Sequence, residues 1–213
     1  MRMARVMRLW PILIGVGLIV TLSGCNKVYE RPQTDPGTGK YSSVEFGQHD
    51  LKKYEPYAGI DSINFVYLRS YSNVKPDEFA EYLKEGLQQM GFKRVYSKEE
   101  LAQHLIATGM AESVGNLNDL LGLNRLSQLA GPYLVLDAGV QHVGGAWFQS
   151  VVVVTDPAKP ETILKASRRT INWMNFDAEI SGPILNLIKR WRDDSSKLPA
   201  PARQPNEAPE AKT

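Results

Sequence analysis

The chain has 213 residues, of which 25 are Lys or Arg and 23 are Asp or Glu, with 43% hydrophobic and 23% charged residues. These proportions are ordinary for a folded protein and exclude a chain that is disordered throughout. The single Cys excludes an intramolecular disulfide and a metal site built from several cysteines. The three His show no metal-ligand spacing either. We therefore predict no metal and no cofactor.

Residues 1–24 have the pattern of a secretory signal peptide. Arg2, Arg5 and Arg8 precede an apolar run over residues 10–22, and small residues lead to Cys25. The run has 13 residues, whereas a membrane-spanning helix needs about 20. The segment is therefore predicted to direct export and then to be removed.

Leu22-Ser23-Gly24-Cys25 resembles the lipobox of bacterial lipoproteins. The resemblance implies cleavage before Cys25, diacylation of its thiol and usually a further acyl chain, such as palmitate, on the new amino group. Two or more acyl chains anchor a protein stably. In such lipoproteins an Asp after the Cys favours the inner membrane, so Asn26 implies an outer-membrane protein facing the periplasm. The alternative is an ordinary signal peptide with a chance Cys.

Removal of the signal changes the charge balance. Residues 1–24 carry three Arg and no acid, so 22 basic residues then face 23 acidic ones. Without a basic surplus, binding to nucleic acid is not expected.

The mature chain is predicted to have three parts. Residues 25–45 form the lipidated Cys and a flexible tether rich in Pro, Gly, Thr and Ser. Residues 46–195 form a single periplasmic domain, long enough for its own core. Residues 196–213 contain four Pro and form a disordered tail.

Within the domain, hydrophobic patterns predict five strands and at least four helices. A strand over 62–71 precedes a helix over 76–90, which has Pro76 at its start and Gly91 at its end. A short strand over 92–96 leads into a capping box at Ser97–Glu100 that opens the second helix. Leu-rich residues 109–131 predict one or two short helices. Strands over 133–143, 147–155 and 162–173 follow, and a last helix spans 177–192, with Pro183 as its true start or a kink.

The order β-α-β-α-β-β-β-α predicts an α+β fold, a mixed sheet with helices packed on it. This order resembles that of small envelope domains: the amino-terminal domain of the Tol-system propeller protein, the curli-secretion lipoprotein and the lipoprotein activators of cell-wall synthases. The segment ILKASRRTINW is similar to the late strand of such lipoproteins. The resemblance is architectural and assigns no role to a residue.

Catalytic patterns are weak in this sequence, and we predict that the protein is not an enzyme. Asp137 in a strand is expected to pair with Lys165, Arg168 or Arg169 on a neighbouring strand. His142 at a strand end is expected to bond turn backbone. An alternative is a ligand-binding or weakly hydrolytic pocket near Asp137, His142 and Trp147. However, residues five apart on a strand face opposite sides, which argues against an Asp137–His142 dyad.

Aromatic residues suggest two contact surfaces. Tyr54 and Tyr57 belong to a Tyr-rich segment that also includes Tyr41 and Phe46, and Tyr suits interfaces. Trp147 with Arg168 and Arg169 makes a second candidate patch. The alternatives are a strap folded over the domain's own core and ordinary cross-strand packing.

Three hypotheses for function follow. The first is a non-catalytic, membrane-anchored lipoprotein whose periplasmic domain binds a protein partner or helps to assemble an envelope complex. The second is the small-ligand or hydrolytic domain described above. The third is a self-associating structural or secretion subunit.

Overall fold

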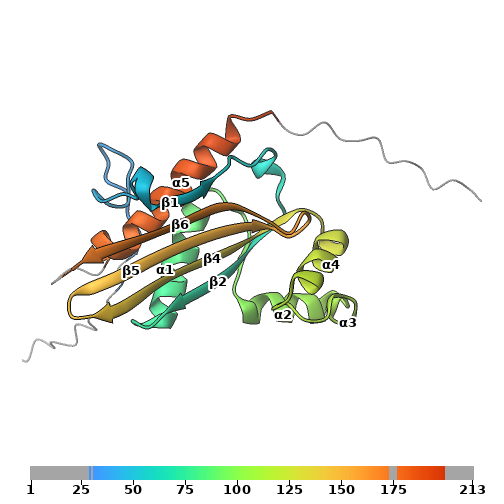
Figure 1. Ribbon diagram of the computed structural model, residues 1–213. Helices are drawn as coiled ribbons and strands as arrows, with labels where there is room; N and C mark the ends of the chain where they lie inside the picture. Colours follow the sequence, from blue (N-terminus) through green and yellow to red (C-terminus); the bar gives the residue numbers. More distant parts are fainter. Residues whose placement is uncertain (1–28, 30, 173–176, 200–213) are drawn as a thin grey trace, which may run out of the picture.

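The computed structural model describes residues 29, 31–172 and 177–199 (Figure 1). The predicted signal segment, Cys25 and most of the predicted tail lie outside the described residues, as does the predicted end of the last strand at residue 173.

Six strands form one sheet in the order β1-β6-β5-β4-β2-β3. β2 runs parallel to β3 and β4, and the remaining neighbours are antiparallel. The prediction of an α+β fold with a mixed sheet is confirmed. The strand bounds are Leu51–Tyr54 (β1), Phe65–Ser72 (β2), Val95–Tyr96 (β3), Tyr133–Gly144 (β4), Trp147–Asp156 (β5) and Glu161–Ile171 (β6).

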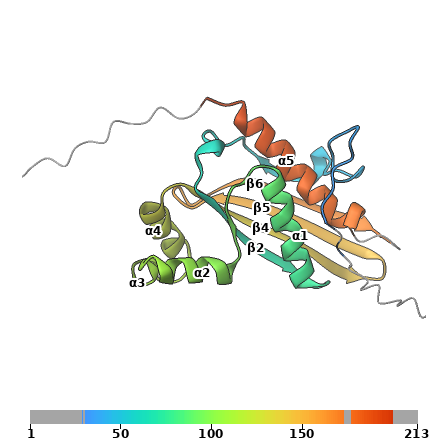
Figure 2. The ribbon, with the colours of Figure 1, turned by 180° about the vertical axis from the view of Figure 1, so that it is seen from behind.

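Helices α1 (Pro76–Gln89) and α5 (Gly182–Ser196) lie together on one face of the sheet, as Figure 2 shows. The larger core forms between them and the sheet. Its fully buried members include Leu83, Leu87 and Trp191. The indole N–H of Trp191 donates to the carbonyl oxygen of Glu55 at 2.8 Å, so this large side chain is buried with its polar atom satisfied.

Helices α2 (Lys98–Ala107), α3 (Ala111–Val114) and α4 (Leu120–Ala130) gather at one end of the opposite face (Figures 1 and 2). A second, smaller core lies beneath them and includes Phe65, Tyr67, Tyr133 and Val135. These three helices leave the rest of that face uncovered in the part of the chain that the structure describes (Figure 1).

The end signals in the sequence agree with the helices in the structure. Pro76 begins α1, with Asp77 and Glu78 in its first turn. The Ser97 hydroxyl accepts from the Glu100 N–H at 3.2 Å, and the Glu100 carboxylate accepts from the Ser97 N–H at 2.9 Å. The predicted capping box is therefore confirmed.

Pro183 lies at the beginning of the α-helix and not at a kink within it. A π-helical turn, Asp177–Ser181, precedes α5, and the proline occupies the first turn of that helix. A proline is tolerated there because the first amide groups of a helix have no partner within the helix.

Two features near the amino terminus differ from the expectation. The sequence predicts no strand at β1, which is short and contains two Lys, yet its residues pair with β6. The expected tether reaches residue 45, whereas Tyr41 and Ser42 are buried and hydrogen-bonded to the Asn186 side chain. The packed part of the chain thus begins before residue 46, because a polar side chain of α5 holds this segment against the core.

Candidate interaction surface

One part of the sheet surface has no helix over it, and we call it the open face. It consists of alternate residues of β2, β4, β5 and β6 beyond the helices α2–α4. Strand alternation explains the set, because buried and partly exposed residues alternate along β5. Its members are Arg69, Tyr71, Asp137, Trp147, Gln149, Val151, Val153, Lys165, Ser167, Arg169 and Ile171.

The apolar part of the open face is partly exposed. Trp147 is 47% exposed and Ile171 is 45% exposed. These two residues are direct cross-strand partners of β5 and β6. Val151 and Val153 continue the apolar row along β5 and are half-buried. Exposed large apolar side chains that lie together are typical of interaction sites.

Tyr71 extends the same surface onto β2. It is 37% exposed and lies over Gly139 of β4, where an added Cβ would be 2.2 Å from the tyrosine ring. A glycine is therefore required at 139 for the ring to rest on the sheet. Burial raises the pKa of the Tyr71 hydroxyl, and the nearby Asp137 carboxylate raises it further.

The charges of the open face are unequal. Arg69 and Asp137 form an ion pair with 2.6 Å between Nη2 and Oδ2, and their side chains are 32% and 23% exposed. This pair is neutral as a unit. Lys165 and Arg169 have no ion-pair partner among the described residues. The open face therefore carries a positive surplus.

The sequence predicted an ion-pair partner for Asp137 on the wrong strand. The sequence predicts Lys165, Arg168 or Arg169, but the carboxylate binds Arg69 of β2. The register explains the difference: Arg69 lies directly beside Asp137, whereas Val153 of β5 separates Asp137 from Lys165. Strand order in a sheet is a tertiary property that spacing along the chain does not supply.

The expected separation of Asp137 and His142 is confirmed. The His142 ring lies 5.0 Å from the Phe148 ring, which belongs to the core under α1 and α5. Its Nε2 is 2.6 Å from the carbonyl oxygen of Gly145 in the hairpin turn. Asp137 belongs to the opposite face, so the structure does not bring the two together. Of the three residues of that alternative pocket, only Asp137 and Trp147 share a face.

The five residues predicted for a partner surface fall into two groups. Trp147 and Arg169 lie on the open face. Arg168 faces the other way, and its guanidinium donates to the Glu45 carbonyl and to Thr170 Oγ1. Adjacent residues of a strand point to opposite faces, which is why the Arg168–Arg169 pair is divided.

Tyr54 and Tyr57 contact α5 and not the open face. The Tyr54 hydroxyl donates to Asp194 at 2.7 Å, and the Arg190 guanidinium lies 5.5 Å from the ring centre. The Tyr57 N–H donates to the Ser195 hydroxyl at 2.9 Å. Burial raises the pKa of both tyrosines to about 12, with Asp194 adding for Tyr54 and Asp156 for Tyr57. Tyr54 is thus held through its hydroxyl and Tyr57 through its backbone amide, in both cases by contacts within the domain.

Several residues of the open face were not among the sequence candidates, and they include Arg69, Tyr71 and Ile171. Parity along each strand offers a signal for Ile171, because it shares the alternation of Arg169. No comparable signal exists for β2, whose pairing with β4 is known only from the structure. A separate group of exposed apolar side chains lies on α2 and α4 and consists of Ile106, Leu120, Leu121 and Leu129.

No family model matches this sequence, and no curated protein matches it either. Among solved structures, the chain is similar to the LpoB C-terminal domain of Salmonella enterica, with 15% identity, a TM-score of 0.35, and coverage of 52% of this chain and 84% of the other. It is also similar to the lipoprotein GNA1162 of Neisseria meningitidis, with 15% identity, a TM-score of 0.36, and coverage of 62% and 95%.

A third similar structure is the PelC dodecamer of Paraburkholderia phytofirmans, with 12% identity, a TM-score of 0.35, and coverage of 71% and 96%. TM-scores of this size do not establish a common fold, so no function follows from these likenesses. In the portion of the chain that the structure covers, no helix has both the length and the apolar character needed to cross a membrane.

Proposed function

We propose that this chain is a membrane-anchored lipoprotein whose periplasmic domain binds a protein partner through the open face. The observation that carries the proposal is the cross-strand pair Trp147 and Ile171, each nearly half exposed on the part of the sheet face that no described helix covers. The partner surface that fits has an apolar centre and an acidic rim.

The apolar centre would supply most of the affinity. Interface residues that matter most are often Trp, Tyr and Arg near the middle of the contact, and truncation of one typically costs about 2 kcal/mol or more. Trp147 lies on the open face with Ile171 beside it, and Tyr71 lies on the same face. Burying these side chains would remove apolar surface from water at little cost in conformational freedom, because aromatic rings have few rotatable bonds.

The acidic rim follows from the charge surplus. Arg169 lies on the strand that carries Ile171, and Lys165 lies further along it. Because neither has an ion-pair partner among the described residues, an acidic partner would meet uncompensated charge. Such rim charges mainly accelerate association and select the partner.

The anchor is proposed from the sequence. Cys25 would carry the acyl chains, and Asn26 favours an outer-membrane location facing the periplasm. Cys25→Ser should release the protein from the membrane fraction after cell lysis, whereas Ser23→Ala keeps the thiol and should leave it anchored. Membrane association of Cys25→Ser equal to that of the unaltered chain would refute acylation as the anchor.

We propose a binding role and no catalytic one. Asp137 is neutralised by Arg69, and the His142 ring bonds the backbone of its own turn. Asp137 is held in its ion pair and His142 lies on the other face of β4, so the two groups do not act together on a molecule at the open face.

A crosslinking experiment in intact cells tests the proposal. A photoreactive amino acid replaces Trp147, and an affinity tag follows Thr213. The matched control places the same group at Ile106, which is 70% exposed on α2. A reproducible adduct with another protein from position 147 is expected, and Arg169→Glu should diminish it. Lys52→Glu, an equal charge change at an exposed residue of β1, should not.

The same experiment separates the alternatives. Adducts formed only between copies of this chain would favour the self-associating subunit. Equal adducts from positions 147 and 106, or none from 147, would contradict the open face as the binding surface.

A further inference from the structure

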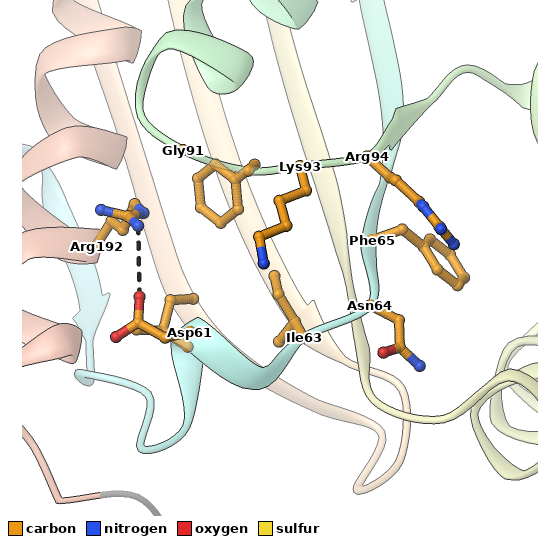
Figure 3. Close-up of a pocket in the computed structure, with 10 residues that line it drawn as sticks. Asp61, Ile63, Asn64, Phe65, Gly91, Lys93, Arg94 and Arg192 are labelled. Carbon is orange, nitrogen blue, oxygen red and sulfur yellow. Dashed lines mark hydrogen bonds and ion pairs between the residues drawn. The ribbon is translucent and has the colours of Figure 1, made fainter.

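A cavity of about 190 Å³ lies away from the open face, where three segments of the chain meet. The first is the turn η2 (Ile60–Ser62) with the loop that leads to β2. The second is the connection from α1 to β3. The third is α5, which contributes Arg192 (Figure 3).

The inner wall of the cavity is apolar. Ile60, Phe65 and Phe92 line it and are each at least 94% buried. The Arg192 guanidinium lies 5.6 Å from the centre of the Phe92 ring, a distance typical of a cation–π contact. This contact holds the guanidinium at the wall.

Three cations surround the opening. Lys93 and Arg94 extend from the loop after α1, and Arg192 approaches from α5 (Figure 3). Lys93 and Arg94 are exposed, and neither has an ion-pair partner among the described residues. Positive charge therefore converges on the cavity from two elements that lie far apart in the sequence.

The negative charge at the cavity does not balance this set. Asp61 is the only carboxylate among the residues that line it; its side chain is 66% exposed and 3.4 Å from the Arg192 Nη2. The C-terminal end of α1 adds the equivalent of about half a negative charge. Three cations against roughly one and a half negative charges leave a surplus of about 1.5.

Gly91 allows Arg192 to take this position. The glycine has a φ of +93°, and a Cβ added there would lie 3.1 Å from the Arg192 Nη2. Any larger residue would meet both backbone strain and the guanidinium. The loop is thus shaped so that the cation can reach the cavity.

We propose that this cavity binds a phosphate group. Guanidinium groups match phosphate oxygens with paired hydrogen bonds, and the charge surplus exceeds what a single carboxylate would offset. The volume corresponds to roughly six water molecules, so it accepts a small anionic group and not a drug-sized ligand. Where the phosphate belongs to a larger molecule, the apolar wall would contact the group attached to it.

The phosphate source is either free phosphate or the headgroup of an anionic phospholipid. The test uses the full chain in non-ionic detergent and follows its backbone amide NMR signals. Inorganic phosphate is added in one arm and monomeric dihexanoyl phosphatidylglycerol in the other. Sodium chloride of equal ionic strength and dihexanoyl phosphatidylcholine are the respective controls.

Three variants test the direction in which charge at the cavity changes the affinity for phosphate. Lys93→Ala should weaken binding by about five- to tenfold, because a charge-assisted hydrogen bond is lost. Asp61→Asn should strengthen it by about two- to fivefold, since the competing carboxylate is removed. Lys52→Ala changes the same charge on β1, away from the cavity, and should leave the affinity unchanged.

If inorganic phosphate shifts the signals of Gly91–Arg94, and its affinity falls in Lys93→Ala, rises in Asp61→Asn and is unchanged in Lys52→Ala, free phosphate is supported as the ligand. If only phosphatidylglycerol gives these shifts and these changes in affinity, the phospholipid headgroup is supported as the ligand. Equal affinity for all variants, or no shift at these residues beyond the controls, overturns the proposal.

Discussion

Replacing Gly139 with Ala tests the packing that forms the open face. The added Cβ would lie 2.2 Å and 2.3 Å from two Tyr71 ring carbons and 2.5 Å from the Tyr71 carbonyl oxygen. The ring is 37% exposed and can turn outward, but the carbonyl belongs to β2, which pairs with β4 at this point. The backbone must therefore shift as well.

Overpacking of this kind costs about 1–3 kcal/mol, and the backbone overlap places the expected value near 2 kcal/mol. Alanine also lowers the conformational entropy of the unfolded chain, which stabilises the fold by about 0.4–1 kcal/mol. The net loss in the free energy of unfolding is then about 1–2 kcal/mol. For a domain of this size it corresponds to a fall in Tm of roughly 2–8 °C.

The assay is urea unfolding of the full chain in non-ionic detergent, followed by circular dichroism. Tyr71→Ala and the double variant complete a thermodynamic cycle. Because Tyr71→Ala removes the ring but not the carbonyl, it should cost less in the Gly139→Ala background than in the unaltered chain. Gly139→Ala with unchanged stability, or additive effects in the double variant, would refute the packing argument.

The remaining predictions concern stability elsewhere in the domain. Ser97→Ala removes the capping box of α2 and should lower the free energy of unfolding by about 1 kcal/mol in urea titrations. Asp137→Asn leaves Arg69 without its carboxylate and should cost about 1–3 kcal/mol, whereas Asp193→Asn in the more exposed Lys189 pair should cost at most about 0.5; equal losses would contradict this account. The pKa of Tyr54, about 12 in the fold against 10.0 ordinarily, means that the unfolded chain releases this proton first as pH rises. Stability is therefore fully present below pH 10 and falls between about pH 10 and 12, and Tyr54→Phe should lessen that fall in thermal unfolding scans; an identical fall would exclude Tyr54 as its source.

Local signals in the sequence identified most of the elements. Pro76 and the capping box at Ser97 mark helix starts because their effects involve only the next turn of chain. Along β4, Leu134, Leu136, Ala138 and Val140 share one buried face because successive strand residues face opposite sides. The same alternation predicted the separation of Asp137 from His142.

The open face was only half predictable. Trp147 and Arg169 were among the candidates, and both lie on it. Arg168, Tyr54 and Tyr57 were candidates as well, but they contact Glu45 and α5. Their contacts cross long stretches of chain, and a list of residue types does not contain them.

The sequence by itself determined the mixed α+β class, the positions of most helices and strands, and the pattern of a lipoprotein signal. These properties depend on periodicity and short motifs, which involve near neighbours in the chain. The tertiary structure decided which strands lie side by side, and so it gave Asp137 its partner Arg69 and left Trp147 and Ile171 uncovered. It also brought Lys93, Arg94 and Arg192 to one cavity, because charges distant in sequence meet only when the chain has folded.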